Sequence, residues 1–343
     1  LRSRWLWLPL AALNLWAAQA LIRALEPMPT LLLVAALVAF LLAQPVAWCR
    51  GLGLQRSTAV AVVLGGLTLV LMALMGWLVP LFMAQLQSLL AALPQWIQQA
   101  TANVQRLDQS LDQWGVSLSL HPLQSSLQSW ALKLGGSLSR EGPKWLGSGV
   151  GFLLHAVMGL FLTLFLLLGG QGQLQQLLGW LPVVPRQRLL RISNQVLRSY
   201  AWGLIITAVL YGMALWLVLT LLGIPYALVF SVLISATTLV PYAGAITILL
   251  VSAVLLLVSP ELGLRFALGA VITGQVIDHS IYPLLMNRIL SFSPAAVILI
   301  VLFAGQLCAV LGLPVVLGLL LGLPAAAVTR EMLQPEPSSE LGV

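Results

Sequence analysis

One acidic residue at the end of an apolar stretch is the most informative chemical feature of this sequence. Asp278 closes the apolar run Leu262–Ile281 and has Gln275 and His279 beside it. An ionisable group at membrane depth is energetically costly and by default indicates a functional site. Asp278 with His279 could carry a proton, and with Gln275 it could bind a cation or a hydroxylated solute. The structural alternative is that Asp278 pairs with Arg288 at the membrane interface or caps a helix end.

Two long apolar blocks flank this acid, and each is interrupted near its middle. The blocks are Tyr226–Val258 and Pro294–Val328, and both are too long for one upright span. The interrupting residues are Pro241, Tyr242 and Gly244 in the first block and Gly312 and Pro314 in the second. Paired Pro/Gly-interrupted segments point to transporter binding sites, because unwound backbone exposes carbonyls and helix ends to a substrate or ion. The alternative is two long, kinked helices whose freed backbone groups are satisfied by Thr237, Thr238 and Thr247.

The composition requires lipid around most of the chain. Of 343 residues, 60% are hydrophobic and only 7% are charged, whereas soluble proteins carry about 25% charged residues. A water-soluble globule is therefore excluded. Because the backbone must satisfy its own hydrogen bonds in lipid, and because runs such as Leu160–Leu168 lack the alternation of a barrel, the spans are helices.

These features predict an all-α polytopic membrane protein with about seven to eight transmembrane helices, two of them interrupted or re-entrant. The expected helices are Trp5–Leu25, Thr30–Trp48, Thr58–Phe82, Ser148–Leu168, Trp202–Leu222, Tyr226–Val258, Leu262–Ile281 and Pro294–Val328.

The basic residues predict the orientation of the spans. The net charge is +7, but the bases are scattered, so we expect no nucleic-acid partner. Arginines near span ends are retained on the cytoplasmic side, which places both termini there. Four of them, Arg186, Arg188, Arg191 and Arg198, lie on an amphipathic stretch from residue 171 to 200 and are expected to anchor it at the membrane interface.

A polar insertion from residue 85 to 147 predicts an extracytoplasmic helical module. Its apolar residues alternate steps of four and three, as in a heptad seam: Leu86, Leu90, Leu93, Ile97, Ala100, Val104, Leu107, Leu111 and Trp114. Pro94 should kink or break this helix. The seam could pack on the membrane domain of its own chain or join subunits in a homo-oligomer. The chain then divides into residues 1–84 (three helices), 85–147 (the module), 148–200 (fourth span and linker), 201–330 (transport core) and 331–343 (a disordered tail).

No catalytic or cofactor signature is present in the sequence. It contains no phosphate-binding loop, no HExxH zinc pair and no GxSxG nucleophile elbow. Cys49 and Cys308 are far apart and lack metal-ligand spacing. We therefore expect neither an enzyme nor a metal or cofactor site.

A series of short motifs resembles one transporter family. The motifs are Tyr200-Ala201-Trp202-Gly203, Gly223-Ile224-Pro225-Tyr226-Ala227, Leu239-Val240-Pro241-Tyr242-Ala243-Gly244, Gln275-Val276-Ile277-Asp278, Pro283, Pro294 and Gly312-Leu313-Pro314. Their order, after three spans, a polar insertion and a fourth span, resembles that of the AI-2E family of bacterial membrane transporters, also described as PerM-like permeases.

The resemblance implies a permease of the bacterial cytoplasmic membrane that assembles into homo-oligomers. It places the family's Pro-x-x-Gly element on Pro241 and Gly244, and its acid element on Gln275, Asp278 and Pro283. Some relatives export the autoinducer-2 signal and others are described as sodium/proton antiporters. The leading hypothesis is a transporter for a small polar solute such as an autoinducer-2-like signal, with ion-coupled exchange as one mechanism. The alternatives are a sodium/proton antiporter and a non-transporting scaffold that binds a partner through its extracytoplasmic module.

Overall fold

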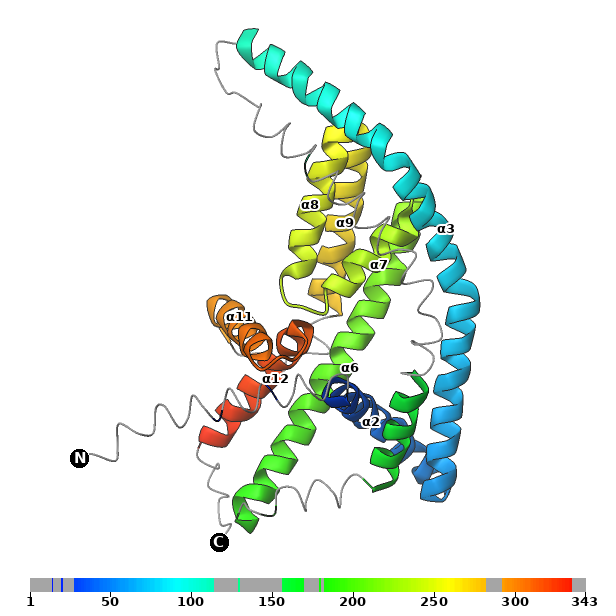
Figure 1. Ribbon diagram of the computed structural model, residues 1–343, viewed down its shortest axis with the longest axis vertical. Coiled ribbons are helices and arrows are strands. Elements are labelled where there is room, and N and C mark those ends of the chain that lie inside the picture. The colour runs from blue at the N-terminus through cyan, green and yellow to red at the C-terminus, as the bar shows by residue number, and fades with distance from the viewer. Residues whose placement is uncertain are drawn as a thin grey trace, which may run out of the picture. The chain divides into compact units, whose positions relative to one another are not determined.

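The computed structural model is helical throughout the residues that it describes, which are 28–113, 156–169, 182–281 and 292–334 with isolated positions at 14, 20, 129 and 179 (Figure 1). The helices are α2 (Met28–Gly51), α3 (Arg56–Gln113), an unlabelled helix Ala156–Gly169, α6 (Val183–Leu221), α7 (Ala227–Thr237), α8 (Ala243–Val258), α9 (Pro260–Ser280), α11 (Pro294–Val310) and α12 (Val315–Leu333). The predicted all-α fold is confirmed.

Four of these helices are long and apolar enough to cross a membrane. They contain the stretches Thr30–Gly51, Arg56–Ser110, Arg186–Leu221 and Val315–Leu333. Four shorter apolar helices accompany them: Ala156–Gly169, α7, α8 and α11. The prediction of a polytopic membrane protein therefore holds. Helix α9 matches the predicted helix Leu262–Ile281 but belongs to neither group by length and composition, and the predicted first span, Trp5–Leu25, lies outside the described residues.

The chain forms two compact units. One unit comprises Leu1–Leu67, Leu154–Leu204 and Leu285–Val343. The other comprises Thr68–Leu153 and Ile205–Leu284, and it contains the candidate site. We call the latter the site unit.

Helix α3 runs without interruption for 58 residues, about 87 Å at 1.5 Å per residue. It includes Pro80 and Pro94, so Pro94 does not break the helix, and a kink there stays a prediction. A proline removes one backbone donor, and α3 is hydrogen-bonded to neighbouring helices on both sides of Pro94, through Gln85 and Asn103. One helix also crosses the predicted boundary at residue 85, and α6 likewise joins the basic linker to the following span.

Two amide side chains fasten α3 to the ends of shorter helices in the site unit. Asn103 Nδ2 donates to the carbonyls of Leu257, at 2.9 Å, and Val258, at 3.1 Å, where α8 ends. Gln85 Oε1 accepts a hydrogen bond of 3.1 Å from the backbone N–H of Leu228 in the first turn of α7.

Part of the predicted heptad seam is buried within the chain itself. Ala100 and Val104 are only 6% and 2% exposed. Trp96, on the same stretch of α3, packs its ring 5.6 Å from the ring of Tyr226. For these residues the structure supports packing on the same chain, while a seam between subunits stays a prediction. The side chains of Leu111 and Trp114 lie outside the described set.

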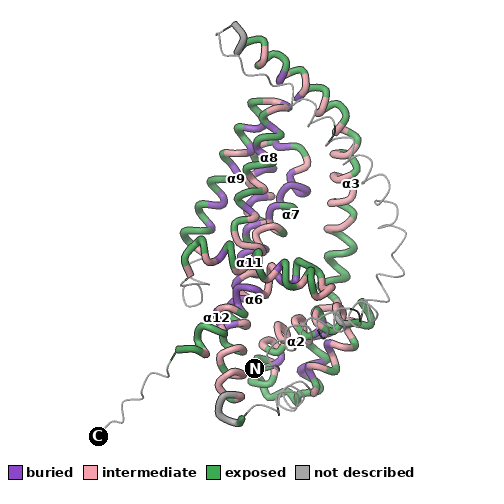
Figure 2. The backbone as a smooth tube through the Cα atoms, turned by 60° about the vertical axis from the view of Figure 1, so that its left-hand side comes forward, coloured by how far each residue is buried: buried purple, intermediate pink, exposed green. Residues whose placement is uncertain are grey.

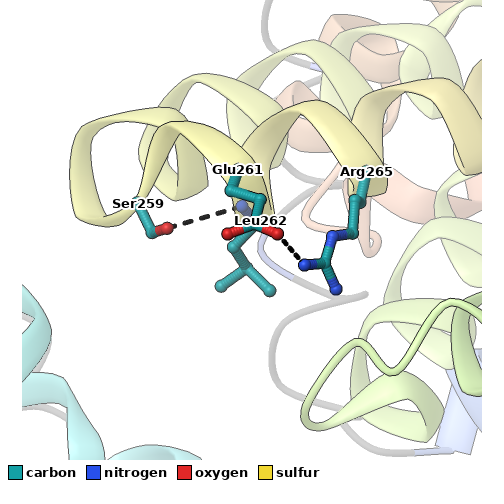
Figure 3. A network of polar contacts seen from close by, with 4 residues as sticks. All are labelled: Ser259, Glu261, Leu262 and Arg265. Atoms are coloured by element: carbon teal, nitrogen blue, oxygen red, sulfur yellow. Dashed lines mark hydrogen bonds and ion pairs between the residues drawn. The ribbon is translucent and has the colours of Figure 1, made fainter.

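The core of the site unit is formed by α6, α7, α8 and α9. Leu215, Ile234, Leu255 and Phe266 are almost fully buried, and buried residues gather where these helices face one another (Figure 2). Helices α8 and α9 form a hairpin that turns at Ser259, whose hydroxyl accepts from Leu262 N at 3.5 Å, and the exposed ion pair between Glu261 and Arg265 follows it (Figure 3). This hairpin positions the candidate site.

The other unit contains a second hairpin, formed by α11 and α12. Its helices touch at glycines, since a Cβ added at Gly318 would lie 2.2 Å from the carbonyl oxygen of Ala304, and one at Gly322 would lie 2.6 Å from the Ala304 Cβ. Close approach at small residues is typical of helix pairs in membranes. Helix α12 continues to Leu333, so the predicted boundary of the disordered tail at residue 331 lies too early in the sequence. Residues 335–343 lie outside the described set.

Gly318→Ala should destabilise the protein, because its methyl group would overlap the Ala304 carbonyl. Overpacking of this kind costs about 1–3 kcal/mol. The matched control is Gly66→Ala in α3, where an added Cβ has no neighbour within 4 Å among the described residues. This control should leave stability unchanged or raise it by up to about 1 kcal/mol through helix propensity. Thermal unfolding in detergent measures both; equal melting temperatures would contradict the packing argument.

Candidate functional site

The hairpin of α8 and α9 brings the first interrupted block and the acidic residue together. Because the two helices run antiparallel from the turn at Ser259, residues equally distant from Ser259 lie at about the same level. Ala243 is therefore level with Gln275, and the turn before α8 lies at the same end of the hairpin as the last turn of α9 (Figure 1). We call this end, with residues 238–244 and 275–280, the polar end of the hairpin.

Pro241 lies in a turn between two helices. Helix α7 ends at Thr237 and α8 begins at Ala243, so the first block is two short helices, not one long kinked helix. The turn is closed by backbone hydrogen bonds from Val240 N to Thr237 O, at 3.0 Å, and from Ala243 N to Val240 O, at 3.1 Å. Thr238 Oγ1 donates to Ser235 O at 2.7 Å, so this hydroxyl satisfies a carbonyl group in the last turn of α7.

The turn is tight and strained. Tyr242 has φ +66°, in the left-handed region that costs a residue with a Cβ about 1–2 kcal/mol. Gly244 is buried, and a Cβ there would lie 2.6 Å from Thr238 Cγ2, so only glycine fits without a shift. Strained backbone of this kind is concentrated at functional sites.

The side chain of Asp278 lies at the edge of the buried face of α9. Gly274 and Ile277 are buried, whereas Gln275, Asp278 and His279 are exposed on the surface of the protein. Asp278 is therefore not covered by other described residues of the chain, and its place at membrane depth stays a prediction. At 100° per residue, Asp278 lies only about 40° around the helix from Gly274, whereas Gln275 and His279 point away from the core. His279 Nδ1 lies 3.0 Å from the carbonyl oxygen of Gln275.

The second interruption is also a turn. Gly312 has φ +75°, Leu313 N donates to Cys308 O at 2.8 Å, and Pro314 directly precedes α12. Gly312 and Pro314 belong to the unit that does not contain Asp278, so a path formed between the two blocks stays a prediction. Pro283 and Arg288 lie outside the described residues.

The four arginines lie in the first half of α6, and one of them has a role that the sequence did not reveal. Arg188 donates to the carbonyl oxygens of Glu331, at 3.3 Å, and Gln334, at 2.5 Å, at the C-terminal end of α12. A cation there satisfies unpaired carbonyls and complements the helix dipole. Anchoring of Arg186, Arg191 and Arg198 at the membrane interface stays a prediction.

Sequence reasoning also missed Tyr211, a buried residue of α6. Its hydroxyl donates to the carbonyl of Ala270 on α9 over 3.5 Å and lies against Gly274. The signal available in the sequence was a pair of hydroxyl residues, Thr207 and Tyr211, four positions apart in a mostly apolar span. Among the described residues, no three His, Cys, Asp or Glu side chains gather in a way that could hold a metal ion.

Comparison with known proteins identifies a family match over nearly the whole chain. The model of the AI-2E family transporter matches residues 7–335. The chain is 27% identical to "Putative transport protein sll0060" of Synechocystis sp. (strain ATCC 27184 / PCC 6803 / Kazusa), with 96% of each chain covered. It is 26% identical to "Putative transport protein sll0063" of the same organism, covering 95% of this chain and 82% of that one. A third relative, "Putative transport protein MT0215" of Mycobacterium tuberculosis (strain CDC 1551 / Oshkosh), is 26% identical, over 82% of this chain and 77% of its own.

Substitution of Tyr242 should reveal the strain in the turn. With the aromatic ring absent from both variants, Tyr242→Gly should be more stable than Tyr242→Ala by about 1–2 kcal/mol, because glycine adopts positive φ without penalty. At an ordinary helical position alanine is more stable than glycine, so Ala253→Gly in α8 should lower the stability of the protein. Thermal unfolding of the four proteins, wild type included, provides the comparison. A Tyr242→Ala variant as stable as Tyr242→Gly would show that the turn is unstrained.

Proposed function

Because this chain belongs to the AI-2E transporter family, we propose that it moves a small polar solute, such as an autoinducer-2-like signal, across the bacterial cytoplasmic membrane. The observation that carries the proposal is the polar end of the hairpin, where a strained helix break and an acidic side chain occur at the same level.

The chemistry of the polar end suits a polar cargo. The carbonyl groups in the last turn of α7 already accept hydrogen bonds from Thr238, Leu239 and Val240. The first turn of α8, in contrast, has no side-chain cap from Tyr242, so this helix start offers N–H donors. Irregular backbone at membrane depth is tolerated where it is buried in protein or lines a water-filled cavity. Gln275 and Asp278 add an amide and a carboxylate on α9, and both are exposed and accessible to a cargo.

Sodium/proton exchange is the second candidate, and a specific observation favours it. Between residues 199 and 280 the sequence contains two acids, Glu261 and Asp278. Glu261 is paired with Arg265 at the opposite end of α9, whereas Asp278 has a titratable histidine as its neighbour in sequence. A carboxylate beside a histidine is a common element of proton relays in membranes.

The contacts of α3 limit which part of the extracytoplasmic module could serve to bind a partner. Residues Gln85 to Val104 are fastened to the core by Asn103, Gln85 and Trp96, so this stretch contributes to the fold of the site unit. Deleting the whole module would therefore damage the core. A partner-binding role is better tested by replacing only residues 114–147.

Asp278→Asn should reduce the transport rate by about tenfold or more, because losing one hydrogen bond to a charged group weakens cargo binding by about that factor. The full chain is reconstituted in liposomes, and three probes are followed: labelled ribose, labelled glycerol, and sodium-driven dequenching of a pH dye in acid-loaded vesicles. Glu261→Gln is the matched control, since it removes the other acid of the same helix, and it should transport like wild type.

The three probes separate the two candidates. Movement of ribose or glycerol supports solute transport, and dequenching alone supports sodium/proton exchange. Undiminished flux in Asp278→Asn would remove this carboxylate from the mechanism.

A further inference from the structure

The buried side of the polar end is built from α6, which packs antiparallel against α9. A Cβ added at Gly269 would lie 2.6 Å from Leu222 Cδ1, and one added at Gly274 would lie 3.0 Å from the hydroxyl of Tyr211. Later residues of α9 therefore face earlier residues of α6. One further turn along each helix brings Thr207 of α6 to about the level of Asp278 of α9.

Tyr211 is placed to act on Asp278. Ala270, Gly274 and Asp278 are four residues apart and form one row along α9, and the Tyr211 hydroxyl lies on this row beside Ala270 O and Gly274. Because Gly274 has no side chain, nothing from that residue separates the hydroxyl from the next turn. Helical side chains lean toward the N-terminus of their helix, which directs the Asp278 carboxylate back toward Tyr211.

Thr207 has an unused hydroxyl in the same region. The residue is 7% exposed, and its Oγ1 is buried without a hydrogen-bond partner among the described residues. Leaving a buried hydroxyl unsatisfied is destabilising, and an apolar residue of the same shape would avoid that cost. A buried polar group without a partner at the level of an acidic site is therefore suited to bind a ligand.

We propose that Thr207 and Tyr211 form the inner wall of the Asp278 site. Tyr211 is a positioning residue: its single O–H leaves the 3.5 Å contact with Ala270 O, donates a hydrogen bond to the Asp278 carboxylate and directs that carboxylate toward the cargo. Thr207 supplies a hydroxyl that binds a polar group or cation of the cargo. This inference rests on the proposed function, and it extends the site from the exposed end of the hairpin into the helix packing.

Thr207→Val tests the cargo contact. Valine keeps the shape of threonine, so the variant should unfold at or above the wild-type temperature, because it removes an unsatisfied polar group. Its KM should rise about tenfold for whichever of ribose, glycerol or sodium the wild type carries, while kcat changes less than about twofold.

Ser252→Ala is the matched control for Thr207→Val. Ser252 is also 7% exposed with a buried, unpartnered Oγ among the described residues, but it is level with Phe266, about three turns of α9 away from Asp278. This variant should keep the wild-type KM. A wild-type KM in Thr207→Val would overturn the role of Thr207, while the effect of Asp278→Asn would still stand for the proposed function.

Tyr211→Phe tests the positioning role without any cargo. The full chain in liposomes is treated with dicyclohexylcarbodiimide, which modifies carboxyl groups, and the adduct on Asp278 is followed by peptide mass spectrometry. A carboxyl group held by a hydroxyl donor reacts more slowly, so Tyr211→Phe should be modified about tenfold faster than wild type and than Ser252→Ala. Equal rates in the three proteins would overturn the role of Tyr211. Since this readout needs no transport, it separates failure of the inference from failure of the proposed function.

Discussion

The unpaired backbone groups at helix ends are the constraint on which this architecture depends. In a chain with many short helices and little water around it, each end leaves N–H or C=O groups that need partners. Two long helices, α3 and α6, supply several of them through long polar side chains. Gln85 and Asn103 bind the ends of α7 and α8, Arg188 binds the end of α12, and Arg56 donates to Leu167 O, at 2.8 Å, near the end of the helix Ala156–Gly169.

This arrangement explains why polar residues are tolerated in such an apolar sequence. Their hydrogen bonds replace those that water would provide, and they fix which helices lie side by side. Glycines then allow the close contacts that the hydrogen bonds require. Gly263 lies against the Leu256 backbone in the hairpin of α8 and α9, as Gly318 lies against Ala304 in the hairpin of α11 and α12. Both hairpins therefore combine a short turn with backbone contact, a geometry in which a larger residue must displace a helix.

The site follows from the same constraint. A helix break needs local partners for its backbone, and here the turn around Pro241 is held by its own hydrogen bonds and by Thr238. The hairpin then determines what lies opposite the turn, which is the last turn of α9 with Gln275 and Asp278. Strain at Tyr242, the start of α8 and a carboxylate thus occur together because of one reversal of the chain at Ser259.

The sequence by itself determined the membrane class, the positions of most helices, the two interruptions, the acidic residue and the family. These properties follow from local composition and from patterns a few residues long, so they can be predicted without knowledge of the tertiary contacts. Only the tertiary structure decided that α3 continues through Pro94, that Asp278 is exposed, and that Tyr211 lies beside Gly274. These outcomes depend on residues far apart in sequence, such as Asn103 and Leu257, which are 154 positions apart. A side chain that binds a distant helix end leaves no periodic pattern of its own, and packing alone selects its partner.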